Sequence, residues 1–156
     1  MMPEYERLQI DSLLQPKPAQ IARGSGLFVM PATEVCDTVY HFAVRSAFRK
    51  NEIDASQAVV VFDTDSLLGD VARYLATIEV IVVDLTNLQS ELMYVLGLCH
   101  GMGRCPILIV QKGEAVPFNL QALRCVEYVA DKEGLFDLRE NLERAVRTFL
   151  LASRAS

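Results

Sequence analysis

The sequence predicts an α/β fold of the flavodoxin-like (Rossmann-like) type, a three-layer sandwich around a five-stranded parallel sheet in the order 2-1-3-4-5. Short apolar runs typical of buried strands alternate along the chain with longer segments whose apolar residues recur at helical spacing. Five such units joined by right-handed crossovers favour this strand order. The 156 residues fit one domain with a core, and 51% hydrophobic residues indicate a globular chain.

The N-terminal stretch is expected to stand apart from the domain. We predict an N-terminal arm or linker over residues 1–25 and the α/β domain over 26–152. Prolines 16 and 18 end a short helix predicted over 4–14, and the Gly-Ser-Gly sequence at 24–26 predicts a flexible joint. An arm onto a partner and a terminus packed on its own domain both remain open.

The first two units occupy the next part of the chain. A strand is expected over 27–30 and stops at Pro31. A helix over 34–50 follows, because its apolar residues recur every three or four positions. The β-branched run at 58–62 predicts a strand buried on both faces, with a helix over 67–76 behind it.

The remaining units follow the same alternation. A third strand is expected over 80–83, and the helix behind it spans 90–102. The apolar runs at 106–110 and 125–129 predict the last two strands. An amphipathic pattern over 135–151 predicts the closing helix.

Charge and hydropathy exclude several classes of partner. The net charge of −5 argues against nucleic acid, whose phosphates require a basic surface. No apolar run reaches the ~18 residues of a membrane span, so no membrane partner is expected. The N-terminus lacks the apolar segment of a secretory signal. We therefore expect a cytoplasmic protein.

The cysteines and glycines predict neither a metal nor a bound cofactor. Cys36, Cys99, Cys105 and Cys125 show no CxxC spacing, and buried free thiols are the favoured interpretation. The chain contains no phosphate-binding glycine motif of the Walker or dinucleotide type.

Several short sequence motifs (words) along residues 26–150 carry a family resemblance through their shared order and spacing. They are Phe28-Val29-Met30-Pro31, Asp37-Thr38-Val39-Tyr40, Val83-Asp84-Leu85-Thr86, Tyr94-Val95-Leu96-Gly97-Leu98 and Val116-Pro117-Phe118-Asn119-Leu120. With these words the chain resembles the nucleoside 2-deoxyribosyltransferase-like group, which is related in fold to TIR-like domains. Active members of that group cleave or transfer the N-glycosidic bonds of nucleosides, nucleotides or NAD.

The departures from the family pattern fall on its chemistry. The catalytic glutamate of the family's Y-E-L-G word is Val95 here, and the aspartate of its P-F-D-L word is Asn119. Valine can neither attack an anomeric carbon nor balance the positive charge of an oxocarbenium-like transition state. The resemblance therefore implies a divergent member that keeps the frame of the pocket and lacks its usual catalytic carboxylate.

Two carboxylates could replace the missing glutamate if the chain is active, Glu91 and Asp84. Glu91 lies one turn before the valine, where an acid also favours the helix dipole. Asp84 ends a buried strand, where it could bind sugar hydroxyls or cap the following loop. The predicted ligand-binding residues are Met30, Pro31, Asp37, Tyr40, Asp63, Asp84, Thr86, Asn87, Val95, Phe118 and Asn119.

The sequence therefore favours a non-catalytic pseudoenzyme-type module that binds a nucleoside- or nucleotide-type ligand or a partner protein. The alternative is an active N-glycosidase: a deoxyribosyltransferase, or a nucleotide or NAD glycohydrolase. The family resemblance also implies a homo-oligomer, with the surface of the helix at 90–103 as an expected interface.

Overall fold

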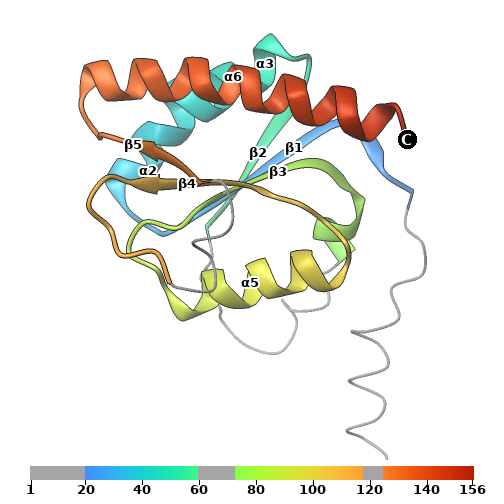
Figure 1. Ribbon diagram of the computed structural model, residues 1–156, viewed down its shortest axis with the longest axis horizontal. Helices are drawn as coiled ribbons and strands as arrows, with labels where there is room; N and C mark the ends of the chain where they lie inside the picture. The colour runs from blue at the N-terminus through green and yellow to red at the C-terminus, as the bar shows by residue number, and fades with distance from the viewer. Residues whose placement is uncertain (1–19, 60–72, 118–124) are drawn as a thin grey trace, which may run out of the picture.

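The computed structural model describes residues 20–59, 73–117 and 125–156, which form one parallel sheet between two layers of helices (Figure 1). The sheet has five strands in the order β2-β1-β3-β4-β5, so the predicted topology is confirmed. The strands are β1 (Ala22–Met30), β2 (Asp54–Val59), β3 (Ile78–Asp84), β4 (Ile107–Gln111) and β5 (Cys125–Tyr128).

Helices cover both faces of the sheet. On one face, α2 (Glu34–Val39), the π-helical turn η1 (Tyr40–Val44) and α3 (Arg45–Lys50) form one continuous segment beside α6 (Lys132–Arg154). On the other face lies α5 (Ser90–Gly101) (Figure 1). The helices predicted at 34–50 and 90–102 are confirmed. Within the part of the chain that the structure describes, no helix has the length and apolarity to cross a bilayer.

The central strands are buried on both faces, as a parallel sheet under two helical layers requires. Phe28 and Val82 belong to the core beneath α6, while their neighbours Val29 and Val83 belong to the core beneath α5. All four side chains are at most 2% exposed. Because successive side chains point to opposite faces, the two cores follow directly from the apolar runs in the sequence.

The first strand begins earlier than predicted. β1 starts at Ala22, so the expected flexible joint at 24–26 is wrong. Gly24 has φ +79°, and the pairing with β3 shifts register between Ala22 and Gly26. Gly26 is required by packing, because a Cβ there would lie 2.5 Å from Ile53 and 2.7 Å from Phe48.

Other boundaries also move. β2 begins at Asp54 rather than at 58, and the closing helix runs from Lys132 to Arg154, beyond both of its predicted ends. Asp131 caps the N-terminus of α6 by accepting a hydrogen bond from the Gly134 N–H at 2.7 Å. The helix predicted at 67–76 is described only over its last turn.

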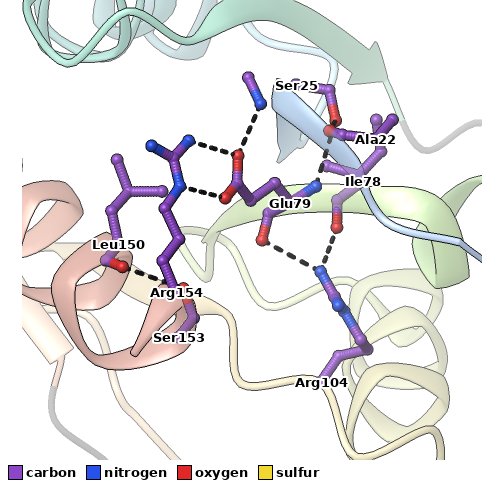
Figure 2. Close-up of polar contacts among 9 residues, drawn as sticks. Ala22, Ser25, Ile78, Glu79, Arg104, Leu150, Ser153 and Arg154 are labelled. Carbon is purple, nitrogen blue, oxygen red and sulfur yellow. Dashed lines mark hydrogen bonds and ion pairs between the residues drawn. The ribbon is translucent and has the colours of Figure 1, made fainter. Parts of the chain in front are cut away.

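A charged cluster anchors the end of α6 to the start of β3, opposite the carboxyl ends of the strands (Figure 2). Arg154 donates from Nε and a terminal nitrogen to the two carboxylate oxygens of Glu79, at 2.7 and 2.8 Å. The Gly24 N–H donates to the same carboxylate at 2.6 Å. Arg104 donates to the carbonyls of Ile78 and Glu79. Hydrogen bonding by Arg154 lowers the pKa of Glu79, although burial acts against it.

The four thiols are free and differ in exposure. Cys36 and Cys99 are buried, as expected, and Cys125 is half-buried. Cys105 is exposed, so the expectation of burial is wrong at this position, which lies in the loop before β4.

Candidate functional site

The topological switch point lies between β1 and β3, where the chain changes its direction of travel across the sheet. β1 ends at Met30 and is followed by Pro31, and β3 ends at Asp84. All three residues are buried. The sequence placed the candidate site here, and the structure brings these strand ends together.

Asp84 forms the centre of a buried hydrogen-bond network. Its Oδ1 accepts from the Thr86 N–H at 2.9 Å and from the Thr86 hydroxyl at 2.6 Å. Its Oδ2 accepts from the Tyr128 hydroxyl at 2.8 Å and from the Cys36 thiol at 3.7 Å. Asp84 is 0% exposed, and this burial raises its pKa, while the hydrogen bonds oppose the shift. Both oxygens are therefore occupied by donors of the chain itself.

The hydrogen-bond partners of Asp84 are themselves buried and make further contacts inside the protein. The Thr86 hydroxyl also accepts from the Gln111 N–H at 3.0 Å, which ties the loop after β3 to β4. Burial raises the pKa of the Cys36 thiol to about 12, and the nearby Asp84 charge raises it further. Burial and the same charge raise the pKa of Tyr128. Cys36 therefore stays a thiol at neutral pH, which is the less nucleophilic form of cysteine.

Besides Met30, which is 1% exposed in the core beneath α6, two more of the predicted ligand residues lie in the cores. Val95 is 1% exposed and packs in the core between α5 and the sheet. Tyr40 is 7% exposed, stacks on Phe28 with ring centroids 6.1 Å apart, and donates to the Ala55 carbonyl at 3.3 Å. Neither side chain is presented to a ligand at the switch point.

Three other predicted residues lie nearer the surface. Asp37 is exposed in the first turn of α2. Asn87 is exposed with φ 59°, and its N–H donates to Glu114 at 3.4 Å. Glu91 is half-buried in the first turn of α5 and accepts from the Ser90 hydroxyl at 3.0 Å. The remaining predicted residues lie outside the described part of the chain: Asp63, Phe118 and Asn119.

A cleft of about 280 Å³ opens at the carboxyl ends of β4 and β5, beside the first half of α6. Sequence reasoning missed it. The available signal was the polar pair Asp137 and Asn141, four residues apart on the closing helix and hence on one face. The lining comprises Lys112, Glu127, Tyr128, Val129, Gly134, Asp137, Leu138 and Asn141. Tyr128 contributes both to this lining and to the Asp84 network.

Comparisons with known proteins bear on the fold. No protein-family model and no curated protein matches the chain. A flavo di-iron protein variant from Thermotoga maritima matches with a TM-score of 0.65 and 8% identity over 88% of this chain and 38% of that one. A flavoprotein from Thermotoga maritima matches with a TM-score of 0.64 and 8% identity over 94% of this chain and 41% of that one.

The chain spans about two-fifths of the length of each of these proteins. Identities this low establish a shared fold and carry nothing further about ligand or activity. The resemblance to the nucleoside 2-deoxyribosyltransferase-like group stays a prediction. What the structure and its neighbours show is that the chain has a flavodoxin-like α/β fold.

Proposed function

We propose that the chain is a non-catalytic module that binds a nucleoside-type small molecule at the carboxyl edge of its sheet. The observation that carries the proposal is the state of Asp84, whose two oxygens accept four hydrogen bonds from Thr86, Tyr128 and Cys36. A carboxylate held in this way supports the loop after β3 and has no free lone pair directed at a substrate.

Cleavage of an N-glycosidic bond needs a carboxylate beside the anomeric carbon, because positive charge develops there in the transition state. The position that carries this group in the family is Val95, which is buried in an apolar core. Glu91 lies four residues before it on the helix, about 6 Å along the axis. Its place in the first turn of α5 is explained by the helix dipole. The geometry therefore favours binding over catalysis.

The cleft at β4 and β5 supplies groups suited to such a ligand. The carboxylate of Asp137 and the amide of Asn141 can hydrogen-bond sugar hydroxyls or the edge of a base. Val129, which is 44% exposed, adds apolar surface against which a ring can pack. The volume of about 280 Å³ lies near the lower limit of ~300 Å³ for small-molecule pockets.

The charge of the cleft selects among nucleoside-type ligands. Lys112 contributes one positive charge, while Glu127 and Asp137 contribute two negative charges, so the lining carries a net charge of −1. A phosphate would be repelled by the two carboxylates. We therefore expect an uncharged nucleoside to bind more tightly than the corresponding nucleotide. The same argument predicts weak binding of flavin mononucleotide, a relevant comparison because the names of the two similar structures reported above include a flavo di-iron protein and a flavoprotein.

Calorimetric titration with adenosine, AMP and flavin mononucleotide tests the proposal. We expect adenosine to bind to the wild type and AMP to bind more weakly. Asp137→Ala should weaken adenosine binding about tenfold or more, the usual effect of losing a buried hydrogen bond to a ligand. Asp54→Ala is the matched control, an exposed aspartate at the start of β2, at the opposite edge of the sheet from the cleft.

Chromatography for free base, on mixtures of the protein with adenosine, AMP or NAD, tests whether the module is non-catalytic. We expect no base after prolonged incubation with adenosine, AMP or NAD. Base release that is lost in Glu91→Gln would overturn the proposal and establish an N-glycosidase. Equal affinity of the wild type and Asp137→Ala would place the ligand elsewhere.

A further inference from the structure

The outward side of α6 carries a row of residues that are exposed in the single chain, except Glu143, which is half-buried. α6 is the longest helix of the described chain and shares one helical layer with α2 and α3 (Figure 1). Positions three, four or seven apart share a helix face, so these residues form one stripe. We call the following set the outer α6 stripe: Phe136, Glu140, Glu143, Arg144, Arg147 and Leu151.

The sequence of the outer α6 stripe is complementary to itself when read backwards. Around a centre between Glu143 and Arg144, each acid is mirrored by an arginine and each apolar residue by an apolar residue. Glu140 is mirrored by Arg147. At the two ends, Phe136 is mirrored by Leu151.

Two antiparallel copies of such a helix would place these mirrored residues opposite each other. A two-fold axis through the centre makes every contact occur twice, as in an isologous interface. Glu140 of each copy would then meet Arg147 of the other, and Phe136 would meet Leu151. The pattern is thus what a symmetric helix pair requires.

Within one chain, Glu140 and Arg147 can pair with Arg144 and Glu143, each four residues away on the same helix, and such exposed pairs stabilise a helix only weakly. The helix dipole acts within the first and last turns, whereas Glu140 and Arg147 lie well inside the 23-residue helix. Among the residues that the structure describes, the α6 side chain that forms an ion pair is Arg154, which pairs with Glu79. Glu140 and Arg147 are both exposed.

The apolar ends of the stripe are similarly uncovered. Leu151 is 70% exposed and Phe136 is 44% exposed. Phe136 also belongs to a wider patch, because Arg139 lies 4.4 Å from its ring centroid and 6.0 Å from that of Phe42, which is 41% exposed. Exposed apolar groups gathered in one patch indicate an interaction surface.

We propose that two copies of the chain associate through the outer α6 stripe as an antiparallel, two-fold symmetric pair. The occupant of this surface is therefore a second copy, identified by the charge complementarity of the stripe with itself. The proposal is independent of the ligand, because its test needs the protein alone.

Sedimentation equilibrium of the full chain measures the association directly. We expect a dimer in the micromolar range, because one pair of helices buries a small interface. Glu140→Arg and Arg147→Glu each turn two attractive contacts into two repulsive ones. Each should weaken the dimer about tenfold or more. The double variant exchanges the charges, so it should return the affinity to within about threefold of the wild type.

Lys50→Glu is the control for net charge, since Lys50 is exposed on α3 and lies off the stripe. It should leave the dimer unchanged. A monomer throughout the concentration range would overturn the proposal. A dimer that both single charge reversals leave intact would overturn it equally. At concentrations well below the dimer range, thermal unfolding of each variant should match the wild type, because every altered side chain is exposed and association no longer adds stability.

Cysteine cross-linking tests the antiparallel register. In a Cys105→Ser background, a mixture of the Glu140→Cys and Arg147→Cys variants should form an intermolecular disulfide on mild oxidation. Neither variant should cross-link with itself, because seven residues separate the two levels by about 10 Å, more than a disulfide spans. Self-cross-linking of either variant, or none in the mixture, would contradict the proposed pairing.

Discussion

Replacement of Asp84 by alanine removes the acceptor at the centre of the network behind the candidate site. The Thr86 N–H and the Tyr128 hydroxyl, which now lie 2.9 and 2.8 Å from the carboxylate, would lose their partner inside the protein. Each buried donor left without a partner costs about 1 to 3 kcal/mol. Alanine also removes a carboxylate that burial disfavours, which offsets part of the loss. We therefore expect the free energy of unfolding to fall by about 3 kcal/mol.

Urea unfolding at pH 7, followed by circular dichroism, measures this loss. With a denaturant dependence of about 2 kcal/mol per molar, the midpoint should fall by about 1.5 M. Asp84→Asn keeps the acceptor of both Thr86 donors and should cost less than about 1 kcal/mol. The control is Asp37→Ala, an exposed aspartate whose loss should change stability by less than about 0.5 kcal/mol.

The reasoning is refuted if Asp84→Ala unfolds at the wild-type urea concentration. It is refuted with equal force if that variant keeps its stability and loses adenosine binding. Asp84 would then serve the ligand, and the assignment of its four hydrogen bonds to loop support would be wrong.

Three further predictions use the same unfolding assay. Val95→Glu should lower the free energy of unfolding by several kcal/mol, because it buries a carboxylate among apolar side chains at a site that is 1% exposed. Val95→Thr, which is close to valine in shape, should lower it by less. Equal stability of the wild type and both variants would place the site in solvent. The pKa of Glu79 is lowered by Arg154, so its contribution is present above the ordinary glutamate pKa and is lost as pH falls through the folded value. Glu79→Gln should therefore lose less stability than the wild type between pH 7 and pH 3, and parallel losses would contradict this. Gly26→Ala should lower the free energy of unfolding by about 1 to 3 kcal/mol, because its Cβ would lie 2.5 Å from Ile53. An unchanged urea midpoint would show that the neighbouring residues can move to make room for the methyl group.

The order of the strands could be predicted because each apolar run and each amphipathic segment can be recognised from its own local sequence. The start of β1 could not, because the glycines at 24–26 have the composition of a joint. Gly26 belongs to a strand because it pairs with Ala55 of β2 and Val80 of β3, and both pairings join residues distant along the chain. Boundaries set by tertiary packing leave no local signal in the sequence.

For the candidate site, too, features set by the local sequence could be predicted and features set by tertiary packing could not. The place of Asp84 at a strand end followed from the apolar run before it. Its partners Cys36 and Tyr128 lie 48 and 44 residues away, so the sequence left open whether it binds a ligand or caps a loop. The burial of Val95 likewise depends on how α5 packs against the sheet.

One nuclear magnetic resonance titration with adenosine tests the proposed function most directly, because it reports binding and cleavage in a single sample. Amide shifts of the protein report binding, and the proton signals of the nucleoside report any free base. We expect saturable shifts at Lys112, Asp137 and Asn141 and an intact nucleoside after prolonged incubation. Accumulating free adenine that disappears in Glu91→Gln would contradict the account, and so would the absence of any shift in the cleft.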